Sequence, residues 1–160
     1  TFHSIGVDLE VTCGSDTRRV LGQWNDGDTS ALKLIIVNQS QSYTANYKEQ
    51  LYLRVVSEHG TAKGEGWYDK DSTATFSISP KVSASGLWGV LGVGYVFERW
   101  SGDIAAARPA ASILMDRPKT VAASWRTDYT MLYAVIALLA TVVFSGSVIL
   151  FKGTKKQSFH

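Results

Sequence analysis

Residues 96–125 read VFERWSGDIAAARPAASILMDRPKTVAASW, and this stretch decides the fold because an earlier stretch repeats its pattern. Residues 20–24 (VLGQW) match its first five residues, which places Trp24 and Trp100 at equivalent positions, 76 residues apart. A polar turn, an apolar strand, a second turn and an alternating strand follow each tryptophan in the same order. The later strands are offset by 78 residues, because the loop after Asp103 has two extra residues. Loops absorb such insertions at low cost.

The matched segments have the pattern of β-strands, and so do several others. Alternation with period two gives a strand one buried and one exposed face. The segments with this pattern or an apolar strand pattern are residues 7–11, 34–37, 43–47, 51–56, 74–78, 112–115 and 121–125. We therefore predict an all-β domain of residues 1–128, made of two related small β units of about residues 1–50 and 51–128, arranged as a sandwich or open barrel. Trp24 and Trp100 are expected in its core.

The composition excludes several classes of function. A net charge of +2 over 160 residues is too small for a general nucleic-acid surface. Cys13 is the single cysteine, which excludes an intramolecular disulfide and a thiolate-rich metal site. We interpret Cys13 as a small apolar residue of the first strand.

The C-terminal part of the chain differs from the rest. Residues 130–151 read TMLYAVIALLATVVFSGSVILF and carry no charge. As a helix this run would cover roughly 33 Å, about the thickness of a bilayer core. We therefore expect a transmembrane helix at residues 129–151, after the β domain.

The residues that flank this run give the expected orientation. Trp125, Tyr129 and Tyr133 lie at its N-terminal side, where aromatic rings favour the headgroup region, and lysines follow its C-terminal side. The lysines predict a cytoplasmic basic tail at residues 152–160. The expected location is the cell membrane, with a single pass and the N-terminal domain outside. A signal peptide before Thr1 is implied only by this topology, since none is visible in the sequence.

One family resemblance rests on three strings. They are VNQSQSYTANYKEQLYLRVVSEHGTAKGEGWYDKDSTATFSI, YVFERWSGD and ILMDRPKTVAASW. Together they resemble the divergent internalin-B-type repeats of exported proteins, and they are most similar to those of archaeal cell-surface proteins. The resemblance covers about residues 20–128. It implies a small Ig-like or ubiquitin-like β fold, an exported location and no intrinsic catalysis.

No group of residues in the sequence has the spacing of a catalytic or metal site. The three histidines, His3, His59 and His160, share no ligand spacing. Residues 68–73 (YDKDST) lack the glycine and distal glutamate of a calcium loop, and there is no GxSxG. We predict no enzyme activity, no cofactor, no metal and no small-molecule substrate.

Asn38 is the candidate glycosylation site. It begins the sequon Asn38-Gln39-Ser40 in an expected hairpin turn on the exported side. An unmodified turn asparagine is the alternative.

Residues 81–94 depart from the repeat pattern and mix glycine with large apolar residues. One interpretation is a longer buried hairpin. The other is an apolar loop that touches a partner or the lipid interface. The partner-contact candidates here are Leu87, Trp88, Val90 and Leu91.

Ala137, Thr141 and Ser145 recur at four-residue spacing and line one face of the expected C-terminal helix. Small residues permit close approach of two helices in lipid. They are the second set of partner-contact candidates.

The favoured function is a non-catalytic accessory or structural subunit of an archaeal-type cell-envelope membrane complex. The expected partners are integral membrane subunits of a hetero-oligomer and the lipid bilayer, with no nucleic acid. A membrane-anchored stalk that tethers a surface layer or a secreted protein is the alternative. A surface carbohydrate-binding module or enzyme is the third class.

Overall fold

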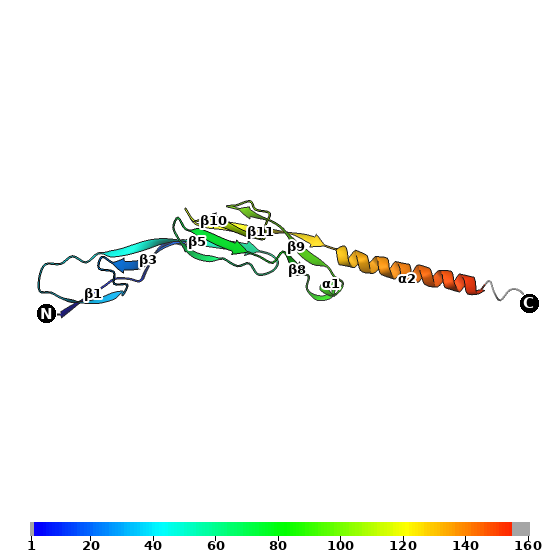
Figure 1. The fold of residues 1–160 in the computed structure, drawn as a ribbon, viewed down its shortest axis with the longest axis horizontal. Helices are drawn as coiled ribbons and strands as arrows, with labels where there is room; N and C mark the ends of the chain where they lie inside the picture. Colours follow the sequence, from blue (N-terminus) through cyan, green and yellow to red (C-terminus); the bar gives the residue numbers. More distant parts are fainter. Residues whose placement is uncertain (1, 155–160) are drawn as a thin grey trace, which may run out of the picture. The chain divides into compact units, whose positions relative to one another are not determined.

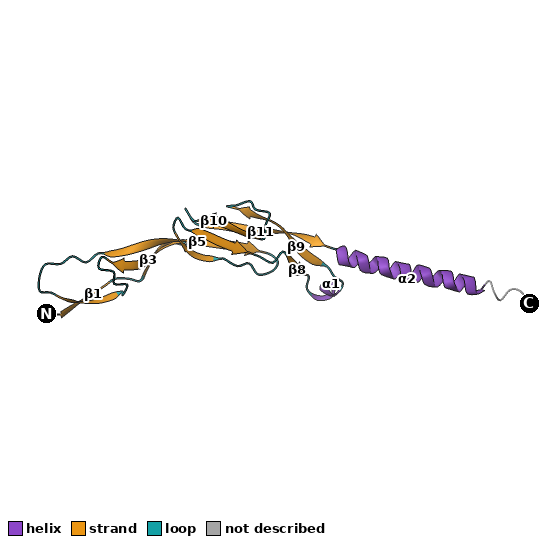
Figure 2. Cartoon of the chain, in the orientation of Figure 1, coloured by secondary structure: helices purple, strands orange, loops and turns teal. Residues whose placement is uncertain are grey.

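The structure, a computed structural model, describes the backbone of residues 2–154 and the side chains through Phe144. Strands make up most of the chain before the C-terminal helix (Figures 1 and 2). The strands are β1 (Phe2–Gly6), β2 (Glu10–Gly14), β3 (Thr17–Trp24), β4 (Leu32–Ile36), β5 (Ala45–Ser57), β6 (Gly66–Asp69), β7 (Thr73–Ser77), β8 (Lys81–Ser83), β9 (Gly94–Gly102), β10 (Ala110–Leu114) and β11 (Lys119–Asp128), and the helices are α1 (Gly86–Val90) and α2 (Thr130–Thr154). The expectation of a β-rich chain is confirmed.

The strands form one large sheet and two ribbons. The seven-stranded sheet has the order β2-β3-β5-β11-β9-β8, and β6 pairs with β5 outside this path. β1 pairs with β4, and β7 pairs with β10, each pair being antiparallel. β5 and β11 are parallel, with Leu53 opposite Lys119 and Val55 opposite Val121.

Contacts divide the chain into two compact units. Unit 1 comprises Thr1–Ile78 and Arg99–Ser124, and unit 2 comprises Ser79–Glu98 and Trp125–His160. This division differs from the boundary near residue 50 that the repeat suggests, because β9 and β11 each contribute residues to both units.

The two tryptophans of the repeat are equivalent in the structure. Trp24 is 3% exposed and Trp100 is 0% exposed, so their predicted burial is confirmed. The Trp24 N–H donates to the Asp28 carbonyl, and the Trp100 N–H donates to the Ala106 carbonyl, each over 2.7 Å. The second turn is two residues longer, as the offset between the sequence copies requires.

The core of unit 1 forms where the β7–β10 ribbon meets the sheet. Phe76 of β7 lies edge-to-face on Trp100 of β9, with ring centroids 4.9 Å apart. Along β5, Leu51, Leu53 and Val55 are buried and the residues between them are not. The period-two pattern of this segment therefore predicts its buried face correctly.

One expectation about local structure is wrong, and one short element was not predicted. Residues 7–11 do not form one strand, because the chain leaves β1 after Gly6 and enters β2 at Glu10. The Val7 N–H bonds to the Ala31 carbonyl, so this residue extends the β1–β4 ribbon, whereas β2 pairs with β3. The short helix α1 is also unexpected, since five residues are too few to show helical periodicity.

The expected transmembrane helix is wrong as well. In the described part of the chain, no helix has the length and apolar character needed to span a bilayer. The predicted single-pass location in the cell membrane is therefore not supported. Residues 155–160 of the expected tail lie outside the described residues.

A network of polar side chains fixes the turn that follows Trp24. The Trp24 indole N–H donates to the Ser30 carbonyl over 2.7 Å. Lys33 bonds to Asp26 and lies 3.2 Å from an Asp28 carboxylate oxygen. Hydrogen bonds from Ser30, and then from Lys33, lower the pKa of Asp28 from 3.8 to about 2.

We predict that Trp100→Ala lowers the free energy of unfolding by about 3–5 kcal/mol, because the Trp100 side chain is fully buried in the core. Chemical denaturation of the full chain measures this. Trp88→Ala is the matched control, since Trp88 is exposed, and it is expected to change the value by less than about 1 kcal/mol. A loss below about 1 kcal/mol for Trp100→Ala would contradict the burial.

We also predict that Asp28 makes unit 1 sensitive to acid. The pKa of Asp28 is about 2 in the folded chain and near 3.8 in the unfolded chain. The charged carboxylate therefore stabilises the fold fully above pH 3.8, and this stabilisation is lost as the pH falls toward 2. Asp28→Asn should therefore show a shallower loss of stability between these two pH values, measured by denaturation at each pH. Identical slopes for the variant and wild type would rule out this role.

Candidate partner-binding site

The segment between β8 and β9 is a tight turn whose shape depends on glycine. Gly86 and Gly92 have φ values of +62° and +82°, which L-residues rarely adopt. A Cβ on Gly89 would lie 2.0 Å from the Ala84 carbonyl oxygen. The backbone therefore passes too close to itself at this point for any side chain.

Backbone hydrogen bonds close this turn. The Ala84 N–H donates to the Val93 carbonyl over 3.0 Å, and the Val93 N–H donates to the Trp88 carbonyl over 2.9 Å. The Leu91 N–H donates to the Leu87 carbonyl over 3.0 Å and completes one helical turn. Residues 84–94, which we call the apolar turn, thus hold a defined conformation.

The apolar turn presents large side chains to solvent. Leu87, Trp88 and Val90 are 69%, 60% and 84% exposed. Leu91 is half-buried and Val93 is buried. The turn is therefore not a buried hairpin along its whole length, and contact of these residues with a partner stays a prediction.

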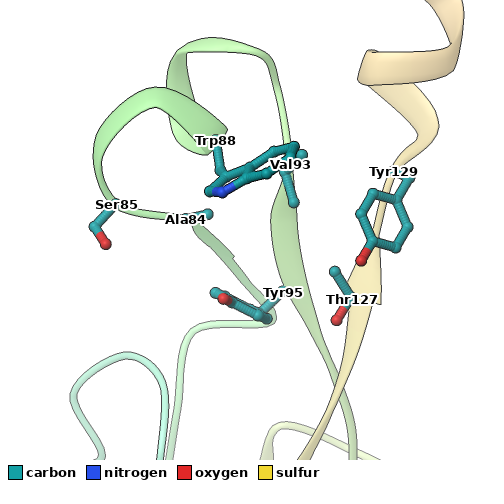
Figure 3. A pocket seen from close by; sticks show the side chains of 7 residues that line it. All are labelled: Ala84, Ser85, Trp88, Val93, Tyr95, Thr127 and Tyr129. Carbon is teal, nitrogen blue, oxygen red and sulfur yellow. The ribbon is translucent and has the colours of Figure 1, made fainter.

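A small cavity opens beside the apolar turn, within unit 2. Its volume is about 260 Å³. Figure 3 shows Trp88 on the side of α1 and Tyr129 on the side of the chain that leads to α2. The lining residues are Ala84, Ser85, Trp88, Val93, Tyr95, Thr127 and Tyr129. Three aromatic rings and four hydroxyl groups, those of Ser85, Thr127 and the two tyrosines, give this cavity a wall of mixed polar and apolar character.

The sequence pattern indicates Trp88 as a site residue but not Tyr95, Thr127 or Tyr129. Tyr95 and Thr127 are far apart in sequence and come together because β9 and β11 are neighbours in the sheet. No short-range pattern in the sequence predicts which distant strands pair. The aromatic residues before and at the start of the apolar run, Trp125, Tyr129 and Tyr133, were the available signal.

Asp128 connects the end of β11 to both β8 and α2. One carboxylate oxygen accepts a hydrogen bond from Lys81 over 2.7 Å, and the other accepts bonds from the Thr130 N–H, over 3.0 Å, and hydroxyl, over 2.5 Å. The Lys81 bond and then the Thr130 bonds hold the pKa of Asp128 well below its usual range. Asp128 therefore stays charged and caps the first turn of α2.

The first turn of α2 also lies against the apolar turn. A Cβ on Gly92 would lie 2.5 Å from the Met131 Cβ. The rings of Tyr129 and Tyr133 have centroids 6.2 Å apart. The apolar turn and the start of α2 thus form one continuous surface within unit 2.

The candidate residues of α2 lie among other exposed apolar residues. Ala137 and Thr141 are exposed, and the Thr141 hydroxyl donates to the Leu138 carbonyl over 2.7 Å. The side chain of Ser145 lies outside the described residues. The exposed large apolar residues of this helix are Met131, Tyr133, Val135, Ile136, Leu138, Leu139, Val142, Val143 and Phe144. Because they occur on every side of the helix, a stripe of small residues does not by itself define its contact face.

Asn38 is exposed in the connection between β4 and β5. This position leaves its side-chain amide accessible to a modifying enzyme, and glycosylation there stays a prediction. In the described residues, no three His, Cys, Asp or Glu side chains lie close enough to hold a metal ion. Cys13 is exposed and lies on β2, the second strand and not the first.

Comparison of the chain with protein-family models, with curated proteins and with solved structures finds no match. The similarity to internalin-B-type repeats therefore rests on the quoted residues of this sequence alone.

We predict that Gly89→Ala lowers the free energy of unfolding by more than about 1 kcal/mol, because the new methyl group would meet the Ala84 carbonyl. Denaturation followed by tryptophan fluorescence measures this. Gly14→Ala is the control: a Cβ there has nothing within 4 Å, so a change below about 0.5 kcal/mol is expected. Equal effects of both substitutions would show that the turn is not tightly packed.

Proposed function

We propose that this chain is a non-catalytic accessory or structural subunit that binds another protein chain through unit 2. The binding surface consists of the apolar turn and the described part of α2. The observation that carries the proposal is the exposure of Leu87, Trp88 and Val90 on a turn of fixed conformation. Large exposed apolar patches on folded proteins mark interaction surfaces.

The energetics of the turn favour binding by a preorganised surface. The glycine positions and the backbone bonds fix the turn, so little conformational entropy is lost when its side chains are covered. Trp88 offers a large ring beside a cavity, and tryptophan is enriched among residues that dominate binding energy. Trp88 is therefore the proposed anchor.

The charge and polarity of the proposed binding surface indicate what kind of partner surface would fit it. Lys81 and Asp128 pair with each other, and the exposed side chains of the apolar turn are uncharged. The partner should therefore present an apolar groove or an apolar helix face, with few charges at its centre. Such an interface suits a lasting hetero-oligomer more than a transient encounter.

The repeat supports the same proposal from the other unit. A small sandwich of internalin-B-type repeats, as the resemblance implies, serves as a spacer or binding module. Unit 1 would then serve as the spacer or as a second binding module, in a complex of the cell-envelope type.

Co-purification of the full chain from its own cells tests this proposal. Wild type should retain a partner protein in a fixed ratio through gel filtration and native electrophoresis. Trp88→Ala should weaken this association roughly tenfold, because an anchor residue carries at least about 1.4 kcal/mol.

Leu34→Ala is the matched control, since Leu34 is an exposed apolar residue of unit 1. This variant should retain the partner as wild type does. The proposal fails if Trp88→Ala retains the partner equally well. It also fails if the purified chain carries no stoichiometric protein and instead partitions into phosphatidylcholine vesicles.

A further inference from the structure

Unit 1 contains a larger groove, which the proposed function does not use. It lies along the outward-facing residues of β5, and its volume is about 610 Å³. This volume falls in the range of sites for small ligands, about 300–1,000 Å³. The lining residues are Ser15, Asp16, Tyr52, Arg54, Val55, Val56, Ser57, Glu65 and Trp67.

An aromatic pair forms one wall of this groove. Tyr52 and Trp67 lie edge-to-face, with ring centroids 5.1 Å apart. The Arg18 guanidinium lies 4.5 Å from the centre of the Trp67 ring and is itself bonded to Gln50 and Glu10. The tryptophan ring is therefore fixed before any ligand arrives.

Charged side chains of both signs form the rest of the wall. Asp16 accepts a hydrogen bond from Arg54 over 3.2 Å. Glu65 accepts one from the Tyr52 hydroxyl and one from the Val55 N–H, each over 3.0 Å. The Glu65 bond raises the pKa of Tyr52, so its hydroxyl keeps its proton. Each of these bonds orients a polar group next to the aromatic wall.

This mixture of groups selects one class of ligand. Two carboxylates, Asp16 and Glu65, repel phosphates and nucleic acid, and the ion pair of Arg54 with Asp16 weakens the attraction of the groove for cations. A neutral ligand with many hydroxyls can donate to the carboxylates and accept from the guanidinium. The C–H face of a sugar ring can pack on the tryptophan. We propose that this groove binds a neutral saccharide.

Several hydrogen-bonding positions remain open for that ligand. A guanidinium has five N–H donors, and Arg54, with a side chain 55% exposed, uses one of them for Asp16. Each carboxylate oxygen can accept more than one hydrogen bond. The sugar hydroxyls would therefore replace water without breaking the bonds that shape the groove.

Binding of neutral oligosaccharides by the full chain tests the proposal. The probes are oligomers of glucose, mannose, galactose and N-acetylglucosamine, with titration followed by calorimetry and by tryptophan fluorescence. At least one series should bind. Arg54→Ala should weaken that binding roughly tenfold, through the loss of charge-assisted hydrogen bonds. Tyr52→Phe, which removes one hydroxyl and keeps the ring, should weaken it less.

Two controls separate this site from the partner-binding site. Arg99→Ala removes an exposed arginine outside the groove and should bind as wild type does. Trp88→Ala should also bind normally, since it changes only unit 2. The proposal is overturned if no oligosaccharide binds, or if Arg54→Ala and Tyr52→Phe bind as tightly as wild type. Neither result would bear on partner binding by unit 2.

Discussion

The parallel pairing of β5 and β11 is the constraint on which the rest of unit 1 depends. It joins the last strands of the two repeat copies, so that copies separated by 76 residues share one sheet. Parallel neighbours need a long crossover connection. Here the crossover carries β6 to β10, and it brings Phe76 onto Trp100. The core therefore contains residues of both copies, since the equivalent residues Trp24 and Trp100 are both buried.

The same strands that form the core also position the candidate sites. The alternation of β5 buries Leu51 and Leu53 and turns Tyr52 and Arg54 outward into the groove. β11 continues from unit 1 into unit 2, where Thr127 lines the cavity beside the apolar turn. A strand that is fixed on its buried face holds its outward residues in a set geometry, which suits binding. The proposed functions of both units therefore follow from one sheet.

The sequence predicts what depends on short-range patterns. The alternation of residues 51–56 and the matched tryptophans identified buried strands correctly, because period two reports a buried face directly. Pairing between distant strands leaves no such signal, so the β5–β11 register, the cavity and the groove were missed. The apolar run after Thr130 gave a helix of the right position, but hydropathy alone led to a membrane span that the described residues do not support.

Native-state hydrogen exchange measures the central constraint most directly. If β5 and β11 hold the two copies together, the most protected amides of both strands exchange only through global unfolding, with the same free energy of opening and the same dependence on denaturant. This common value is the result that the account predicts. Opening of β11 at a distinctly lower free energy than β5 would contradict it, because the copies would then unfold as separate units.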